Sequence, residues 1–292
     1  MKISKCTFDN WKTAYKLTTA KSEMIIGTDK GPRILSLRLN KNENILFVDA
    51  AQKLGRDKWK IYGGHRIWLA PETETCYAPD NAACDVKIEK EKIIITAPID
   101  SVTQTQKVLI VSETKNGFSV TSSIKNVGVM LMTGSVWALT CVRTDAKVFF
   151  PWGRPGNWEM KKICWWKGWA GHGSNIVSLQ WQPTNDLFII NPTGEEGKVG
   201  TGGYDGWIAA AFPALKITFI KKFQYQHNAN YIDEGCALQC YTCNKFIELE
   251  TLSPYQTIYP GETISHTEEW ILIPEVLNPF KPSTIEKILD KI

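Results

Sequence analysis

Residues 33–39 read RILSLRL and residues 118–124 read FSVTSSI, and these two stretches decide the fold class. Side chains along an extended strand point alternately to opposite faces, so three residues of the first stretch are expected on one face: Leu35, Leu37 and Leu39. The second stretch alternates in the same way. Both patterns are typical of a β-strand that buries one face.

Further runs of this kind extend along the chain in both directions. They are rich in β-branched and aromatic residues and are separated by turn signals such as Lys115-Asn116-Gly117 and Pro260-Gly261. The predicted strands cover residues 24–28, 86–97, 107–112, 187–190, 207–212, 217–224, 246–251 and 256–272. Because strands do not alternate with helices, the sequence predicts an all-β fold of two large antiparallel sheets packed face to face.

Helical periodicity is confined to the last segment. Ser283 and Glu286 have the spacing of a capping box, and they accompany an apolar stripe at helical spacing: Ile285, Ile288, Leu289 and Ile292. We predict a short C-terminal helix on the outside of a sheet. With no repeat or linker in the sequence, residues 1–292 are expected to form a single domain, in which the tryptophan-rich segment 150–206 is a lid or insertion.

The composition argues for a small neutral partner. Hydrophobic residues make up 43% and charged residues 22% of the chain, and the formal net charge is +4 without any block of like charge. We therefore expect no binding of nucleic acid or of a membrane. The first residues lack the apolar run of a signal peptide and no segment has the length of a membrane helix, so we expect a cytoplasmic protein. Its eight cysteines are expected to be mostly reduced. We expect the protein to be a monomer or a dimer.

Half of the twelve tryptophans lie close together in the sequence: Trp152, Trp158, Trp165, Trp166, Trp169 and Trp181. Glycines, lysines and an arginine stand between them, so these indoles cannot all face one apolar interior. An exposed indole offers a flat apolar face and one N–H donor, which suits the C–H faces and hydroxyl edges of a sugar. A loop folded over its own aromatic cluster explains the pattern equally well.

Cys236, Cys240 and Cys243 have the spacing C-x3-C-x2-C, which resembles the iron–sulfur signature of radical S-adenosylmethionine enzymes. In that family the motif follows an early strand, whereas here it lies near the C-terminus. Its surroundings also have the pattern of a strand, on which Cys240 and Cys243 would point apart. We therefore predict no metal site.

Residues 62–68, YGGHRIW, are followed closely by Glu72 and bring several kinds of chemistry together. Arginine offers a fork of donors to hydroxyl oxygens, and histidine moves protons near neutral pH. We interpret His65, Arg66, Trp68 and Glu72 as site residues. The alternative is a glycine turn that enters a strand, with Arg66 paired to an acid.

Two other stretches support more than one interpretation. At strand spacing, Trp137 and Leu139 share a face, and core packing is the favoured explanation for both. Residues 202–207, GGYDGW, place Asp205 and Trp207 beside glycines. A turn with a capping aspartate explains this stretch as well as a hydroxyl-binding carboxylate does.

Glu248 and Glu250 lie two residues apart in the stretch FIELETL of residues 246–252, so both carboxylates are expected on one strand face. Two acids among apolar neighbours repel each other and resist ionisation. This raises the pKa of at least one of them toward the range of a general base or acid. The alternative is a solvated face, with Ile247, Leu249 and Thr251 turned inward.

The order of these motifs resembles a branch of the galactose mutarotase-like (aldose 1-epimerase-like) superfamily. The resemblance rests on Gly-Gly-His-Arg-Ile-Trp at 63–68, Trp-Ala-Leu-Thr at 137–140, Gly-Tyr-Asp-Gly-Trp at 203–207 and Glu-Leu-Glu-Thr-Leu at 248–252. It spans most of the chain and is weakest in the tryptophan-rich segment. It implies a β-supersandwich and an aldose 1-epimerase activity on a sugar, without metal or organic cofactor.

The resemblance also implies catalytic roles. Glu250 stands where the family has the base that takes the proton of the anomeric hydroxyl, and Arg66 resembles a sugar-binding arginine. Asp205 resembles, more loosely, a hydroxyl-binding aspartate. The strand that carries the acid histidine in active mutarotases corresponds to residues 135–139, SVWAL, which hold no histidine. We expect His65 to take its place as the acid; His172 is the second candidate and His227 the third.

Two functions stay open at this point. The first is an epimerase-like enzyme with Glu250 as base, His65 as acid and a substrate-binding set that comprises Arg66, Trp68, Glu72, Trp137, His172, Asp205, Trp207 and Glu248. The second is a non-catalytic glycan-binding or sensing protein with the same groove. A lyase-type relative that acts on uronic acids is a third, in which Arg66 would neutralise the carboxylate of the substrate.

Overall fold

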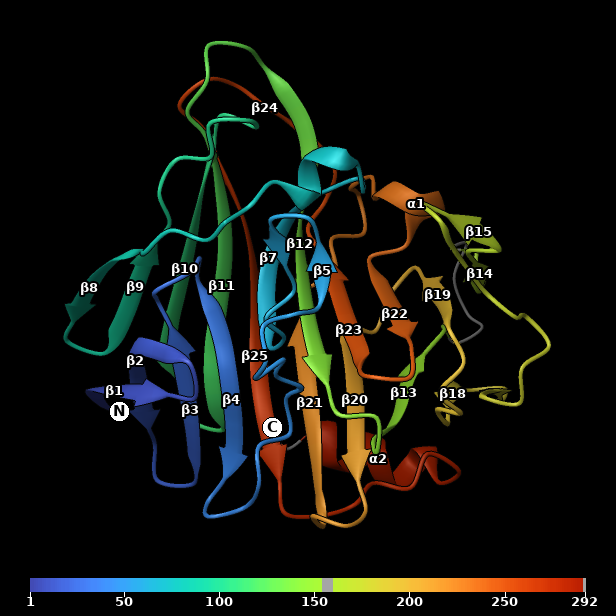
Figure 1. The fold of residues 1–292 in the computed structure, drawn as a ribbon. Coiled ribbons are helices and arrows are strands. Elements are labelled where there is room, and N and C mark those ends of the chain that lie inside the picture. Colours follow the sequence, from blue (N-terminus) through green and yellow to red (C-terminus); the bar gives the residue numbers. More distant parts are fainter. Residues whose placement is uncertain (154–159, 291–292) are drawn as a thin grey trace.

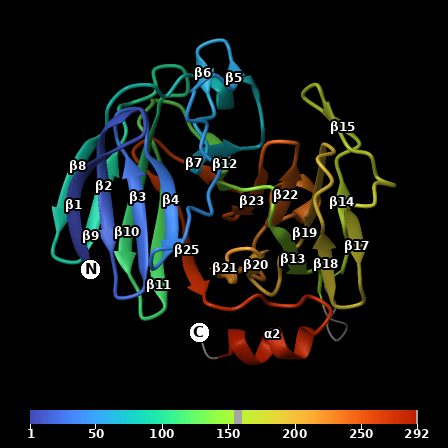
Figure 2. The same ribbon diagram turned by 60° about the horizontal axis from the view of Figure 1, so that its bottom comes forward.

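Two large antiparallel sheets pack face to face (Figures 1 and 2) in the computed structural model, which describes residues 1–153 and 160–290. Within these residues, the first sheet has eleven strands, in the order β1 (Lys2–Phe8), β2 (Trp11–Thr18), β3 (Ser22–Gly27), β4 (Arg33–Leu39), β7 (His65–Ala70), β12 (Met132–Val142), β23 (Ile247–Leu252), β22 (Leu238–Thr242), β19 (Gly197–Thr201) and β14 (Cys164–Trp165), with β24 (Gln256–Ile258) paired to β12.

The second sheet has ten strands in the same described residues. Their order is β17 (Trp181–Pro183), β18 (Leu187–Ile190), β13 (Lys147–Pro151), β20 (Trp207–Phe212), β21 (Ile217–Phe223), β25 (Thr263–Ile273), β11 (Gly117–Asn126), β10 (Thr105–Glu113), β9 (Lys92–Thr96) and β8 (Asp85–Glu89). The fold class predicted from the alternating pattern is therefore confirmed.

The main core lies between the two sheets, where apolar side chains from both inner faces are buried. The predicted alternation of residues 118–124 is confirmed, because Phe118, Val120 and Ile124 all belong to this core. The alternation of residues 33–39 is wrong at Leu35. A bulge against β3 shifts the pairing there, so Leu37 and Leu39 enter the core while Leu35 packs with Trp11 and Tyr62 in a separate cluster.

The predicted run 86–97 is a hairpin rather than one strand, since β8 and β9 pair across a turn at residues 90–91. The first two strands, β1 and β2, also form a hairpin that the sequence patterns did not predict. Both hairpins lie at the edges of their sheets, and β1 has no fully buried residue, so its period-two signal is weak.

The C-terminal helix α2 (Pro282–Leu289) packs outside the second sheet (Figure 2), as predicted, with Ile285 against Trp207 and Phe149. The predicted capping box is wrong, because Lys281 is the N-cap and Pro282 begins the helix, which leaves Ser283 inside the first turn. Ile292 of the predicted stripe lies outside the described residues. Two single turns complete the described helical structure: η1 (Glu74–Tyr77) and α1 (Ile232–Gly235). None of these helices has the length and apolar character needed to cross a bilayer.

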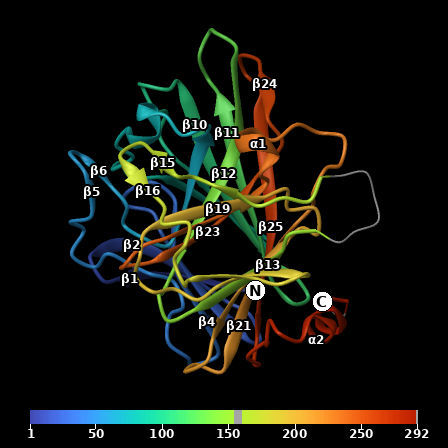
Figure 3. The same cartoon turned by 90° about the vertical axis from the view of Figure 1, so that its right-hand side faces the viewer.

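Two small hairpins stand over the outer face of the first sheet (Figures 2 and 3). One consists of β5 (Gly55–Arg56) and β6 (Trp59–Lys60). The other consists of β15 (Gly168–Trp169) and β16 (His172–Gly173) and belongs to the segment predicted as a lid or insertion. Between them, the outer face of β7, β12 and β23 is left free to form a site.

Candidate functional site

The register of three neighbouring strands brings the predicted site residues together. Leu139 of β12 pairs with Arg66 of β7 on one side and with Glu250 of β23 on the other. Trp137 pairs with Trp68 in the same way. Because alternate residues share a face, all of these side chains project from the outer face of the sheet, away from the core between the sheets.

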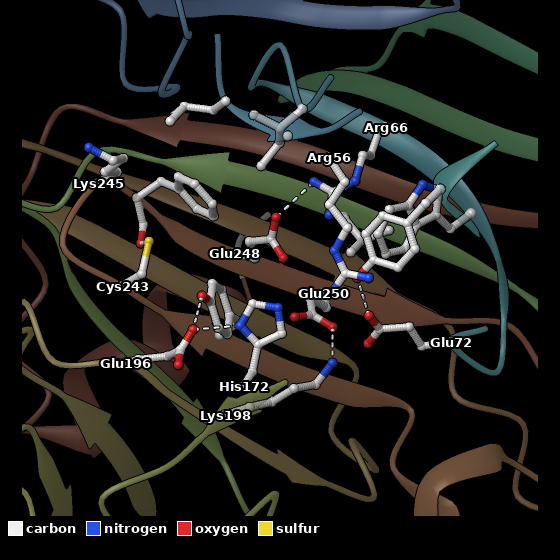
Figure 4. A pocket seen from close by; sticks show the side chains of 18 of the residues that line it. Arg56, Arg66, Glu72, His172, Glu196, Lys198, Cys243, Lys245, Glu248 and Glu250 are labelled. Carbon is white, nitrogen blue, oxygen red and sulfur yellow. Dashed lines mark hydrogen bonds and ion pairs between the residues drawn. The ribbon is translucent and has the colours of Figure 1, made fainter. Parts of the chain in front are cut away.

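These side chains form the floor of a cavity of about 380 Å³. Its size lies within the range of small-molecule sites. Aromatic rings supply much of its wall: Trp59, Trp68, Tyr77, Trp137, Trp169, Tyr241 and Phe246. Its acidic and basic side chains are Arg56, Arg66, Glu72, His172, Glu196, Lys198, Lys245, Glu248 and Glu250 (Figure 4).

Glu250 is fully buried at the floor of this pocket. Its Oε2 accepts hydrogen bonds from Lys198 Nζ at 2.9 Å and from Trp137 Nε1 at 2.8 Å. Burial raises the pKa of Glu250 to about 7, since the favourable charge of Lys198 is offset by the nearby Glu248. The prediction that one of the two paired acids has a raised pKa therefore agrees with its surroundings, and a carboxyl with this pKa exchanges protons readily at neutral pH.

The second acid, Glu248, is held by Arg66. Arg66 Nη1 donates to Glu248 Oε1 at 2.7 Å, and both side chains are buried. The guanidinium also stacks over Trp68 at 4.4 Å from the ring centroid. The alternative of a solvated strand face is wrong at these two glutamates, while Ile247 and Leu249 do point inward. Arg66 is thus committed to a protein carboxylate, which argues against its pairing with a uronic acid.

His172 stands at the rim of the pocket on β16. Its Nδ1 lies 2.7 Å from Glu196 Oε1, and Tyr241 Oη donates to the same oxygen at 2.7 Å. Partial burial raises the pKa of Glu196, but the hydrogen bonds from Tyr241 and His172 outweigh it and lower the pKa below its usual value. The carboxylate therefore fixes the imidazole ring beside Trp169.

The opposite rim is formed by β5 and η1. The Arg56 guanidinium lies 3.9 Å from the centroid of the Tyr77 ring, and Tyr77 Oη donates to Glu72. Arg56 Nη2 also donates to the carbonyl of Ala170 at 3.1 Å. Since Ala170 joins β15 to β16, this contact links the two hairpins across the pocket.

Several polar atoms around the pocket have no partner. Of the eight buried side-chain nitrogen and oxygen atoms without a hydrogen bond in the described residues, four belong to pocket-lining residues: Trp59 Nε1, Arg66 Nε, Trp68 Nε1 and Glu250 Oε1. A buried polar group without a partner is costly. Three donors and one acceptor among aromatic walls suit a ligand whose groups both donate and accept, as hydroxyls do.

The structure places His65 on the other side of the sheet. As the residue next to Arg66 on β7, it points into the space between the sheets, where its exposure is 0%. Its Nδ1 and Nε2 lie 2.9 Å from Thr140 Oγ1 and 3.2 Å from Ser122 Oγ. Burial lowers the pKa of His65 to about 3. The expectation that His65 faces the ligand as the acid is corrected on this ground, because it does not line the pocket.

The glycines before His65 serve the sheet rather than a ligand. Gly64 has a φ of 64°, and a Cβ there would run into the carbonyl of Ile34 on β4. Both explanations given for this stretch therefore apply. The glycines form a turn that enters a strand, and Arg66 is paired to an acid. Arg66, Trp68 and Glu72 also line the pocket.

Asp205 and Trp207 do not reach the pocket. Asp205 is exposed in a turn closed by the bond from Gly206 N to Gly203 O, and Trp207 packs under α2. Their expected places beside the ligand are therefore corrected, since both residues line a separate, smaller cavity beside α2. His227 is also absent from the pocket lining.

The tryptophans of the segment 150–206 lie in different surroundings, and neither the sugar-binding surface nor the self-packed loop describes all of them. Trp169 lines the pocket, and Trp166 lies beside Lys198, with the ammonium 5.3 Å from its ring centroid. Trp181 is buried in the main core and Trp152 packs against it. Trp165 is 39% exposed, and Trp158 lies outside the described residues. The indoles therefore do not form one continuous roof.

Cys236, Cys240 and Cys243 do not converge. Cys240 is buried in the main core, whereas Cys243 lines the pocket. No group of three metal-ligating side chains occurs in residues 1–153 and 160–290. The expected divergence of Cys240 and Cys243 along the strand is confirmed.

Lys198 is a charged pocket residue that the sequence patterns missed. It lies in the run Gly197-Lys198-Val199-Gly200-Thr201, which forms β19, and only 4% of it is exposed. A single lysine inside a short glycine-rich strand was the available signal, because lysine is rarely buried unless it is paired. Trp59 and Tyr77 were missed because they come from a short hairpin and a single helical turn, and Tyr241 because its place at the pocket depends on the pairing of β22 with β23.

The fold and this pocket define a class: two-sheet β-proteins with an aromatic-walled acid–base pocket on one outer face. Among solved structures, a galactose mutarotase-like protein from Lactobacillus casei matches with a TM-score of 0.59 at 12% identity, over 89% of this chain and 100% of that one. A candidate aldose 1-epimerase from Escherichia coli K12 gives 0.61 at 12% identity, over 91% and 99%. A TPR-domain containing protein from Parabacteroides distasonis gives 0.61 at 14%, over 92% of this chain and 48% of that one.

These matches confirm the resemblance at the level of the fold, which is that of galactose mutarotase-like proteins. No family model matches the chain, and no curated protein matches it in sequence.

Proposed function

We propose that the pocket binds a sugar and interconverts its anomers by acid–base chemistry, with Glu250 as the general base. The observation that carries the proposal is the state of Glu250: a buried carboxyl with a pKa of about 7 and one oxygen, Oε1, that accepts no hydrogen bond within the described residues. Such an oxygen is suited to take the proton of an anomeric hydroxyl near neutral pH. The fold shared with galactose mutarotase-like proteins supports the same reaction class.

The remaining pocket residues fit the demands of sugar binding. Trp59, Trp68 and Arg66 line the pocket, and each has a buried N–H group without a partner in the described residues that suits a hydroxyl oxygen; the indole faces suit the C–H faces of a sugar ring. Arg66 and Glu248 neutralise each other, as do Lys198 and Glu250. This pairing of charges favours a neutral sugar or oligosaccharide over a uronic acid.

A non-catalytic glycan-binding or sensing protein is the second candidate. It is favoured by the burial of His65 behind the sheet and by the presence of Trp137, rather than a histidine, beside Glu250. In that function the same donors and indoles bind a sugar that leaves unchanged.

Polarimetry separates the two functions. A panel of aldoses, each dissolved as a single anomer, is followed with wild type and with Glu250→Gln, and binding is measured in parallel by calorimetry. The proposed enzyme accelerates equilibration, and Glu250→Gln slows kcat by roughly 10²- to 10⁴-fold while sugar still binds. Binding with unchanged rotation supports the second candidate, and absence of both binding and acceleration across the panel contradicts both.

A further inference from the structure

We propose that Lys198 is the general acid of this site, acting on the ring oxygen of the sugar while Glu250 acts on the anomeric hydroxyl. The inference rests on the proposed function and deepens it, because it names the group that replaces the missing histidine. Lys198 comes from β19, three strands away from the β12 position at which the resemblance implies an acid histidine.

The position of Lys198 is fixed from several sides. Its Nζ lies 2.9 Å from Glu250 Oε2 and 4.4 Å from the centroid of the Trp137 ring. Trp166 flanks it at 5.3 Å, and its backbone N–H donates to Ser174 Oγ at 2.9 Å. Among the described residues, Lys198 is the one cation within ion-pair distance of Glu250. The ammonium group of Lys198 is therefore held beside Glu250, the proposed general base, and not at the rim of the pocket.

The spacing of these two groups matches the geometry of the reaction. The anomeric hydroxyl oxygen and the ring oxygen of an aldose are bonded to the same carbon, so a base and an acid that serve both must lie side by side. Glu250 and Lys198 are in hydrogen-bond contact, and Glu250 Oε1 is left over for the hydroxyl. His172, in contrast, is 36% exposed at the rim and is held by Glu196, a different carboxylate.

The step balances without any co-reactant. Glu250 Oε1 takes the hydroxyl proton, the electron pair of that O–H bond forms the carbonyl, and the bond from the anomeric carbon to the ring oxygen breaks. The ring oxygen keeps that electron pair and takes a proton from Lys198 Nζ. The open-chain aldehyde then turns about its first carbon–carbon bond, and the reverse transfers close the ring on either face and restore both side chains.

The pH profile distinguishes an ammonium from an imidazolium as the acid. A lysine ammonium ordinarily keeps its proton to about pH 10, whereas an imidazolium loses it near about 6.5. An ammonium acid therefore leaves kcat level above the rise that accompanies the ionisation of Glu250, whereas an imidazolium acid makes kcat fall again near neutral pH. The other charged or titratable groups around the pair are Glu248, Arg66, Tyr241, Glu196 and His172 on the pocket side, and Cys240 and Lys221 on the core side.

The test compares three variants with wild type by polarimetry, with sugar binding measured by calorimetry. Lys198→Arg keeps a positive charge that can pair with Glu250 but is a very weak acid, and Lys198→Met removes the charge. We expect both to lower kcat by roughly 100-fold or more. Lys198→Met should also shift the rising limb of the pH profile to higher pH, because the Lys198 charge lowers the pKa of Glu250. His172→Gln should mainly raise KM.

Each outcome decides the assignment. Activity retained in Lys198→Arg, or a larger kcat loss in His172→Gln than in either Lys198 variant, overturns Lys198 as the acid while the proposed function stands. A wild type without acceleration overturns the proposed function and this assignment together. Unfolded Lys198 variants are recognised by circular dichroism, and the wild-type pH profile then decides, since a fall in kcat just above neutral pH excludes a lysine acid.

Discussion

One buried charge cluster lies against each face of strands β7, β12 and β23, and the two clusters are built differently. The outer cluster faces the pocket and holds Glu250 and Lys198. The inner cluster lies between the sheets and holds Lys221 of β21 and Glu268 of β25, which form an ion pair at 2.7 Å with at most 1% of either side chain exposed. Burial is nearly complete in both, so burial alone does not distinguish a site from a scaffold.

Hydrogen bonding distinguishes them. In the inner cluster, Lys221 Nζ donates to the carbonyls of Ala138 and Leu249, and Glu268 accepts from Trp270 Nε1 and Thr251 Oγ1. None of these six residues has an unpartnered buried polar side-chain atom in the described residues. In the outer cluster, Glu250 Oε1 is unpartnered.

The pKa values follow the same division. Burial would raise the pKa of Glu268, but the charge and hydrogen bond of Lys221 together with the neighbouring His65 and His266 outweigh it and hold the pKa at about 2. At Glu250 the effect of burial exceeds that of Lys198 and Trp137, and the pKa is raised to about 7. A fully bonded carboxylate is locked in one charge state, whereas a partly bonded one can exchange a proton. We infer that the inner cluster joins the sheets, whereas the outer one is suited to the proton transfer proposed above.

The largest expected effect comes from removing one lysine on each face. Lys221→Met leaves Glu268 charged, buried and without its cation, which typically costs about 3–5 kcal/mol of unfolding free energy. Lys198→Met should cost less than half as much. Without Lys198 the pKa of Glu250 rises further above 7, so the carboxyl takes up a proton at neutral pH with little penalty.

Urea unfolding at pH 7, followed by tryptophan fluorescence, measures both variants. Wild type and Glu250→Gln provide the reference, since the latter retains Lys198 and removes the titrating group. Equal losses in Lys221→Met and Lys198→Met would mean that the pocket pair is as structural as the inner pair, and the comparison would fail.

A smaller effect is expected from acid. Burial lowers the pKa of His65 to about 3 and that of His266 to about 4, so both stay neutral in the folded protein while the unfolded chain protonates them below about pH 6.5. Their contribution is complete above that pH and is lost as the pH falls. Glu250 has the opposite sign, because its pKa is raised from 4.5 to about 7 and its contribution is lost as the pH rises through this range.

Two histidines outweigh one glutamate, so stability should fall between pH 6.5 and 4.5 by up to about 1.4 kcal/mol per pH unit. Urea titrations at several pH values measure the slope. His65→Gln should flatten it and Glu250→Gln should steepen it. Because His65 lies outside the pocket, His65→Gln should also keep mutarotation at the wild-type rate, and a loss of kcat would return His65 to the mechanism.

The contrast between the two faces also explains what the sequence could predict. Period-two alternation placed Glu248 and Glu250 on one face and required Ile247 and Leu249 on the other, and the fold class followed from the same signal. The same rule separates His65 from Arg66, and applying it to residues 65–68 would have removed His65 from the site. Lys198 is different, because its nearness to Glu250 depends on the order β23-β22-β19, which no local pattern encodes.

The smallest expected effect concerns the rim of the outer face. Arg56 stacks on Tyr77 and bonds the Ala170 carbonyl, so it joins the two hairpins over the pocket without entering either buried cluster. Arg56→Ala should weaken sugar binding about 5- to 10-fold, the equivalent of roughly 1 kcal/mol for one exposed contact, mainly through faster dissociation. Its unfolding free energy should change by less than about 0.5 kcal/mol.

Arg143→Ala is the matched control, because Arg143 is a comparably exposed arginine that pairs with Glu43 and Asp145 away from the pocket. It should leave sugar affinity at the wild-type value. Calorimetry and stopped-flow tryptophan fluorescence report the affinity and the dissociation rate. If Arg56→Ala destabilised the fold and left binding intact, the two hairpins would be part of the structural scaffold. The binding region of the outer face would then not include its rim.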